Sequence, residues 1–89
     1  MKPQKIQVFD AIDVVVRKRD GLVFTGHVFA VSSTNKIGDF DVLPGHANFI
    51  CTIYDHLTIH NTTDRSQDIK VDSGILRAKG NLVEVYLGI

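Results

Sequence analysis

The sequence predicts an all-β domain, either a sandwich or a barrel, on three observations. Short apolar stretches alternate with polar residues at a period of two, which is the pattern of half-buried strands. Turn residues separate these stretches about every 8–12 positions, as in β-sandwiches and barrels. No stretch of about ten residues has the 3.6-residue periodicity of an amphipathic helix.

A strand is expected at residues 12–17, and Lys5–Phe9 also alternates briefly, which is the pattern of a strand before it. Ile12, Val14 and Val16 share one face, and the β-branched side chains favour a strand over a helix. Asp20-Gly21 follows as a hairpin signal between two apolar stretches. The charges at residues 17–20 are typical of a solvated hairpin end.

Residues 22–31 are expected to form one long strand, interrupted at Gly26. A single glycine inside a strand pattern indicates a bulge or a bend. The cluster Ser32-Ser-Thr-Asn35 is typical of a turn. The sequence therefore predicts that this strand ends before Ser32.

The second half of the chain is expected to add several short strands. Asn61–Asp68 is predicted to be a polar hairpin tip of eight residues, and Lys79-Gly-Asn81 a tight turn. Cys51 is the only cysteine, which excludes an internal disulfide, and its apolar neighbours indicate a small buried hydrophobe. The expected strands are residues 49–54, 57–60, 69–71, 74–78 and 82–87.

Residues 38–47 predict a shaped connection between strands. Gly38 and Gly45 can take positive φ at no steric cost, and Pro44 fixes φ near −65°. Phe40 is one of three large apolar residues that a plain solvent turn would not need. Two interpretations remain open here: an ordinary loop held to the core, or a loop that carries contacts to a partner.

Length and composition limit the classes of function. The 89 residues make one domain, and ten basic residues balance ten acidic ones. A neutral chain offers no basic face for nucleic acid. No apolar run approaches the roughly 18 residues of a membrane helix, and the first five residues lack the core of a signal peptide. We expect the protein to be made and kept in a reducing compartment.

The polar residues predict no catalytic or metal centre. His56 and His60 have a spacing that suits a metal on a helix, but on a strand they would lie about 13 Å apart. Ser32, Ser33 and His27 belong to no nucleophile motif, and no phosphate-binding glycine loop occurs. We therefore expect no catalytic residue, no metal and no cofactor.

A specific resemblance begins in the shaped connection. Gly38-Asp-Phe-Asp-Val-Leu-Pro-Gly-His-Ala47 resembles the G-D-F-G-V-L-P-G-H-A-P signature of the ATP synthase epsilon subunit (delta in mitochondria), in its N-terminal β-sandwich domain. Leu22–Val28 is similar to V-L-F-E-G-E-V, Val71–Leu76 to V-S-G-G-F-L, and Asn81–Val85 to N-R-V-T-V. The resemblance implies a sandwich of two antiparallel sheets over residues 12–89. Residues 1–11 would then be an N-terminal extension or an extra edge strand.

The resemblance also implies a function. It implies a non-catalytic subunit of the central stalk, or rotor, of an F-type ATP synthase. Such a subunit links the gamma subunit to the membrane c-ring and couples proton or sodium transport to ATP synthesis or hydrolysis. It is peripheral, on the cytoplasmic side of the energy-transducing membrane, with no membrane insertion and no small-molecule substrate. The implied ring contacts are Lys36, Ile37, Asp39, Phe40 and Asp41; the implied gamma contacts are His46 and Asn48; Gly38, Pro44 and Gly45 shape the loop.

The sequence departs from the family pattern at several positions. Asp41 stands where the family has glycine, so positive φ there would carry strain. Ile37 replaces an acidic residue and Asn48 a proline, which changes the surface offered to the ring. The chain ends at Ile89 without the C-terminal helical hairpin of longer members, so we expect coupling without inhibition of ATP hydrolysis. The alternatives are a stand-alone β-sandwich module that binds protein, unrelated to ATP synthase, and a small hydrolase.

Overall fold

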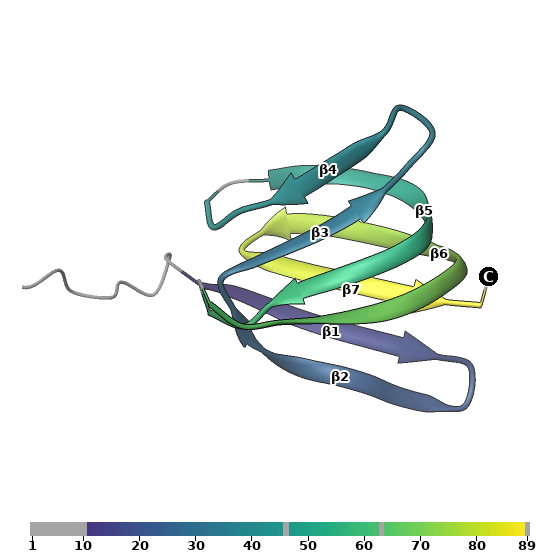
Figure 1. The fold of residues 1–89 in the computed structure, drawn as a ribbon, viewed down its shortest axis with the longest axis horizontal. Helices are drawn as coiled ribbons and strands as arrows, with labels where there is room; N and C mark the ends of the chain where they lie inside the picture. The colour runs from purple at the N-terminus through teal and green to yellow at the C-terminus, as the bar shows by residue number, and fades with distance from the viewer. Residues whose placement is uncertain (1–10, 46, 63, 89) are drawn as a thin grey trace, which may run out of the picture.

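A computed structural model of the protein describes residues 11–45, 47–62 and 64–88. These ranges contain strands and turns but no helix, so the all-β prediction is confirmed. The described residues therefore include no helix long and apolar enough to cross a membrane. The strands are β1 (Ile12–Lys18), β2 (Gly21–Val28), β3 (Ala30–Thr34), β4 (Asp39–Val42), β5 (Ala47–His60), β6 (Ser66–Gly80) and β7 (Leu82–Leu87) (Figure 1).

The strands form one continuous mixed sheet, in the order β2-β1-β7-β6-β5-β3-β4. Neighbouring strands are antiparallel except β1 and β7, which pair in parallel from Asp13↔Leu82 to Arg17↔Tyr86. The expected arrangement was two antiparallel sheets. The sheet is continuous because β5 and β6 pair along nearly their whole lengths, from Ala47↔Gly80 to His60↔Ser66. Figure 1 shows these two strands curving back together, so that the sheet folds over its own inner face.

The bend lies at a break in register. The pairing of β5 with β6 shifts between Ile53 and Asp55, and Asp55 is the one non-glycine residue of the described chain with positive φ (73°). Gly74 lies opposite Ile53, where an added Cβ would stand 2.9 Å from the backbone oxygen of Tyr86. A β-bulge of this kind bends a strand and increases its twist. The two long strands therefore bend where one of them can accept no side chain.

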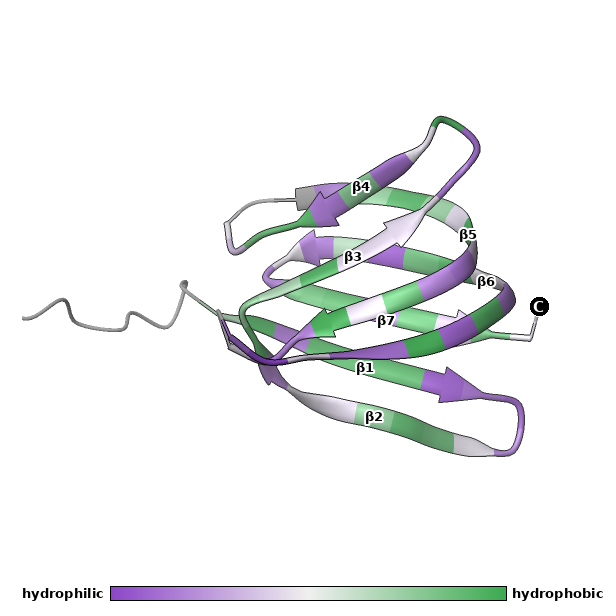
Figure 2. Ribbon diagram, in the orientation of Figure 1, coloured by the Kyte–Doolittle hydropathy of each residue, from purple (hydrophilic) through white to green (hydrophobic). Residues whose placement is uncertain are grey.

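The inner face of the folded sheet holds the core, to which all seven strands contribute side chains. Ile12, Val14 and Val16 are buried together, as their spacing predicted. Figure 2 shows the same alternation of hydrophobic and hydrophilic residues along the later strands. The core cluster is Ile12, Val14, Val16, Val28, Val31, Val42, Ile53, Leu57, Ile59, Val71, Leu76, Ala78, Val83, Val85 and Leu87.

Two expectations in the first half of the chain are wrong. The stretch 22–31 breaks at Phe29 and not at Gly26. Residues 32–34 are strand and not turn, and only Asn35 begins a turn. The reason is that these hydroxyls have cross-strand partners: Ser33 is fully buried and its Oγ donates to the backbone oxygen of His56 at 2.6 Å.

In the second half, the expected short strands merge. Residues 49–54 and 57–60 belong to β5, and 69–71 and 74–78 belong to β6. The polar tip is shorter than eight residues, because β6 begins at Ser66 and Thr58 Oγ1 donates to Asp68 across the pair at 2.5 Å. The strand at 82–87 and the hairpin at Asp20-Gly21 are confirmed. Cys51 is free and half-buried against the core.

Candidate functional site

The candidate site is the β3–β4 hairpin together with the connection from β4 to β5. Its turn spans Asn35 to Gly38. The backbone N–H of each of these two residues donates to the carbonyl oxygen of the other, both at 3.1 Å. The Asn35 side-chain oxygen also accepts from the N–H of Ile37 at 2.8 Å and from that of Gly38 at 3.3 Å. Asparagine first and glycine fourth is the usual composition of a type I turn, so Asn35 is a shaping residue that sequence reasoning missed.

Strand β4 occupies residues 39–42 of the stretch 38–47 that the sequence analysis interpreted as a connection. Asp39 and Asp41 are exposed on its outer side, and each carboxylate accepts a hydroxyl from β3. Thr34 donates to Asp39 at 2.6 Å, and Ser32 donates to Asp41 at 2.5 Å. Asp41 does not have positive φ, because only Asp55 does among the described non-glycine residues. The strain expected at Asp41 is therefore absent.

Phe40 lies on the inner side of β4. It packs against the core, and its ring meets that of Phe49 edge-on, with centroids 5.9 Å apart. This contact fixes the hairpin to the body of the domain. By contrast, Leu43, which follows β4, is 57% exposed.

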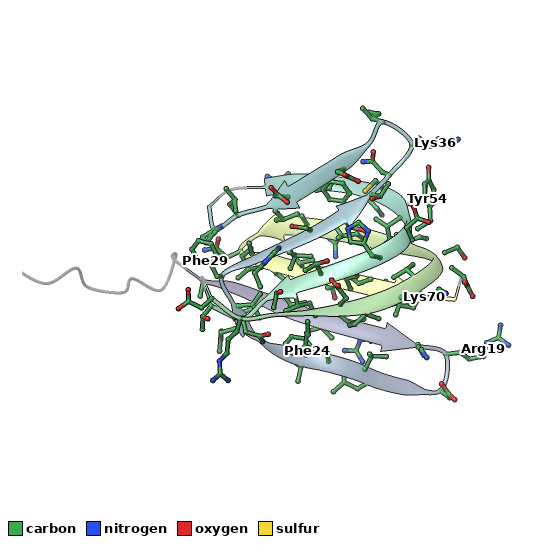
Figure 3. The ribbon with its side chains drawn as sticks, viewed as in Figure 1. Arg19, Phe24, Phe29, Lys36, Tyr54 and Lys70 are labelled. Atoms are coloured by element: carbon green, nitrogen blue, oxygen red, sulfur yellow. The ribbon has the colours of Figure 1, made fainter. Side chains whose placement is uncertain are left out.

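The tip of the hairpin carries Lys36 and Ile37. Both are exposed, and Ile37 is exposed to 96%. Figure 3 shows Lys36 pointing away from the body of the domain. The tip is therefore formed by one cation and one apolar side chain, and the two carboxylates lie further back along β4.

The connection from β4 to β5 lies at the other end of β4 (Figure 1). Gly45 has φ 135° and Gly38 has φ 142°, so both take positive φ as predicted. The N–H of Gly45 donates to the side-chain oxygen of Asn81 at 2.7 Å, which ties the connection to the β6–β7 turn. Asn48 is exposed and pairs with Lys79. His46, the other predicted gamma contact, lies outside the described residues.

A hydroxyl, an imidazole and a carboxylate meet beside β4. Ser32 Oγ lies 2.9 Å from His60 Nε2 and donates to Asp41. They border a shallow hollow of about 240 Å³, together with Phe29, Ala30 and Leu43. In a catalytic triad the carboxylate orients the imidazole through Nδ1 and the serine gives its proton to Nε2. Here the Ser32 hydroxyl donates its hydrogen bond to the Asp41 carboxylate and not to the imidazole. The arrangement is therefore structural.

The other histidines that the structure describes, His27 and His56, form no metal centre. No group of three or more His, Cys, Asp or Glu side chains in the described part of the chain is placed to hold a metal ion. His27 contacts Asp13 on the neighbouring strand, and both are exposed. On the outer side of the sheet, Arg77 and Glu84 form an ion pair at 3.0 Å. These pairs connect strands to each other.

Comparison with known proteins identifies the fold. Residues 11–87 match the family model described as "ATP synthase, Delta/Epsilon chain, beta-sandwich domain". A chain in the cryo-EM structure of the Euglena gracilis mitochondrial ATP synthase (OSCP/F1/c-ring) is similar, with a TM-score of 0.80 and 15% identity over 88% of this chain. A chain of the Tetrahymena thermophila mitochondrial ATP synthase central stalk and c-ring has a TM-score of 0.69 and 10% identity, also over 88% of this chain.

The match covers only part of those two chains. It spans 51% of the Euglena chain and 63% of the Tetrahymena chain. No curated protein matches the sequence. At these identities the likeness to the solved structures establishes the fold, and the family model establishes the relationship.

Proposed function

Because this chain belongs to the ATP synthase delta/epsilon β-sandwich family, we propose that it is a non-catalytic subunit of the rotating central stalk of an F-type ATP synthase. In this proposal it joins the gamma subunit to the membrane c-ring and couples ion transport to ATP synthesis or hydrolysis. The observation that carries the proposal is the family match over residues 11–87. Support comes from the shape of two chains in ATP synthase structures whose titles name a c-ring or central stalk.

The geometry of the hairpin supports a division of contacts. The proposed ring contacts include the exposed tip, and the proposed gamma contact Asn48 follows the connection at the opposite end of β4. These ring contacts are Lys36, Ile37, Asp39, Phe40 and Asp41. A strand of four residues separates these two ends by about 13 Å. The hairpin tip and the start of β5 can therefore meet two different partners at once.

The side chains suggest different roles within the proposed ring contact. Lys36, Ile37, Asp39 and Asp41 are exposed and available to a partner. Phe40 packs inward against Phe49, so we assign it to holding the hairpin in place. The two halves of the curved sheet would act as the two layers of the sandwich for which the family is named. We place the subunit at the cytoplasmic side of the energy-transducing membrane, as a peripheral part of the complex.

A binding experiment tests the proposal. The full chain, tagged and immobilised, is mixed with a purified gamma subunit and with detergent-solubilised c-ring from an ATP synthase that contains a homologue of the chain. We expect each partner alone to be retained, and the two together to be retained more strongly, because the chain would meet both at separate ends. Retention of neither partner would contradict the proposal and favour a stand-alone protein-binding module.

A further inference from the structure

The sheet ends in two edge strands that differ in length and charge. These are β4 at one edge and β2 at the other, at the top and the bottom of Figure 1. The free side of an edge strand presents backbone N–H and C=O groups that can pair with a further strand. Natural sheets protect such edges with short strands and charged side chains. Strand β4 has both protections, because it is four residues long and carries the exposed Asp39 and Asp41.

Strand β2 lacks these protections. It is eight residues long and contains no proline and no Lys, Arg, Asp or Glu. Its one histidine, His27, contacts Asp13 on β1. The register of β1 with β2 shifts once, near the hairpin end, and is regular from Phe24 to Val28. The outer side of β2 is therefore a straight, neutral edge with no strand partner among the described residues.

Apolar side chains accompany this free backbone. Leu22 is 57% exposed and Val23 38%, and Phe24 is only partly buried where it packs on the core. Figure 2 shows the hydrophobic colour along this part of β2. At Gly26 an added Cβ would stand 3.3 Å from the Phe24 ring, so the ring lies beside the glycine of its own strand. The edge thus combines backbone groups with apolar surface, as strand addition requires.

From these observations we infer that the free chain forms a dimer, in which β2 pairs antiparallel with β2 of a second copy across a two-fold axis. Charge favours a copy of the same strand, because neutral β2 meets no like charge in its partner. Two copies of β4 would instead bring Asp39 and Asp41 of both chains together. An axis perpendicular to the sheet also keeps the two inner faces on the same side, so the apolar strip of one copy continues into the other.

The antiparallel direction follows from the charges of the β1–β2 hairpin. Its end carries the exposed cations Arg17, Lys18 and Arg19. No ion pair of these three residues occurs within the part of the chain that the structure describes. Parallel pairing would place the two cationic ends side by side. Antiparallel pairing separates them by the length of the strand, about 25 Å for eight residues.

The two-fold symmetry also limits the assembly to two copies. An isologous interface uses the same surface on both partners and closes on itself. Each copy has one unprotected edge, and the pairing occupies both of them. The dimer uses no residue of the proposed ring or gamma contacts, which lie on the β3–β4 hairpin and at the start of β5.

Sedimentation equilibrium of the full chain, from about 1 to about 500 μM, tests the inference. We expect the mass to rise from one chain to two, with a Kd of roughly 10–100 μM, because a single pair of strands buries little area. A monomer throughout the range would overturn the inference. A series of species larger than the dimer would overturn it as well, since such growth needs a second open edge.

A charge placed in the middle of β2 tests the location of the interface. Thr25 is exposed, and Thr25→Lys puts one cation on the edge strand of each copy. We expect Kd to rise about 5-fold or more at low salt and less at high salt. Thr25→Val stays neutral and should keep Kd within about 3-fold. The matched control is Thr52→Lys, at an exposed site on the interior strand β5, and dimers equally tight in both lysine variants would contradict pairing through β2.

Hydrogen exchange adds a readout that does not depend on a substitution. The β2 amides that point away from β1 should exchange quickly in the dilute chain and slowly in the concentrated one. Slow exchange at every concentration would overturn the inference, because another part of the same chain would then cover the edge. Residues 1–10, with the strand expected at Lys5–Phe9, lie outside the described residues and are the segment for that outcome.

The inference and the proposed function fail separately. A chain that dimerises but retains neither the gamma subunit nor the c-ring contradicts the proposed function and supports the dimer. A chain that stays monomeric and retains both partners contradicts the dimer alone.

Discussion

The backbone N–H of Gly45 donates a hydrogen bond of 2.7 Å to the side-chain oxygen of Asn81, which is 36 residues away in sequence. This bond joins the β4–β5 connection to the β6–β7 turn. The backbone oxygen of Asn81 in turn accepts from the N–H of Asp13 at 2.8 Å, beside the start of β1. One residue therefore holds together three segments at the end of the domain opposite the β3–β4 tip.

Asn81→Ala should loosen the β4–β5 connection. The substitution keeps the backbone bond to Asp13 and removes only the acceptor of Gly45, so we expect a loss of about 1 kcal/mol in the free energy of unfolding. Urea denaturation measures the loss, and hydrogen exchange should accelerate at Gly45 in particular. Gln67→Ala, at an exposed position of β6, is the control and should change neither. Unchanged exchange at Gly45 would show that the bond does not order the connection.

Gly45→Ala should destabilise the domain through the backbone alone. An added Cβ at Gly45 would have no heavy atom within 4 Å, but φ is 135°, which L side chains rarely adopt. We expect a loss of roughly 1–3 kcal/mol. At Gly74, a Cβ would instead meet the backbone oxygen of Tyr86 at 2.9 Å, so Gly74→Ala should cost a similar amount through overpacking. A neutral Gly45→Ala would mean that the connection has no need of positive φ.

Ser33→Ala tests the buried hydroxyl of β3. Ser33 is fully buried and donates to the carbonyl oxygen of His56 beside the register shift between β3 and β5. Its removal leaves that oxygen without this donor, and we expect a loss of about 1–2 kcal/mol by urea denaturation. Ser66→Ala is the matched control at an exposed position and should stay within about 0.5 kcal/mol. Equal stabilities of the two variants would show that the Ser33 bond is not needed.

Asp39→Lys should weaken binding to the rotor without unfolding the domain. The carboxylate is exposed and accepts a bond from Thr34, so its replacement should cost no more than about 1 kcal/mol of stability. Asp68→Lys is a close control, because Asp68 is also exposed and accepts a bond from Thr58 on a different pair of strands. Binding to the c-ring, measured for both variants, should fall only for Asp39→Lys. Equal binding by the two would remove Asp39 from the proposed contact.

The local sequence pattern predicted the strands in which buried and exposed residues alternate. Residues 12–18 show why: Ile12, Val14 and Val16 alternate with exposed or half-buried residues, so burial and period agree. The same reasoning failed at Ser32–Thr34, where small hydroxyl residues have the composition of a turn. Their strand conformation depends on partners distant in sequence, namely Asp41, His60 and the backbone of His56. Composition carries no information about such partners.

In the candidate site, too, sequence predicted the features that depend on residue type and missed those that depend on distant partners. The positive φ values of Gly38 and Gly45 followed from residue type, and both occur. The roles of Asn35 and Asn81 did not, although Asn35 and Gly38 have the spacing of a type I turn and could have been found by it. The bond from Gly45 to Asn81 spans 36 residues and left no signal in either segment. The continuity of β5 through Asp55 was also hidden, because aspartate is depleted in strands and common in turns.

The parallel pairing of β1 with β7 has a consequence for the way the chain acquires its fold. Asp13 pairs with Leu82, so the first strand completes its ladder only with the last. During synthesis, β1 and β2 emerge first and can form a hairpin, but a lone two-stranded hairpin is at best marginally stable in water. Until residues 82–86 leave the ribosome, one edge of β1 stays without its partner. The domain therefore folds only after residues 82–86 have been synthesised, and with the slow kinetics of a topology rich in distant contacts.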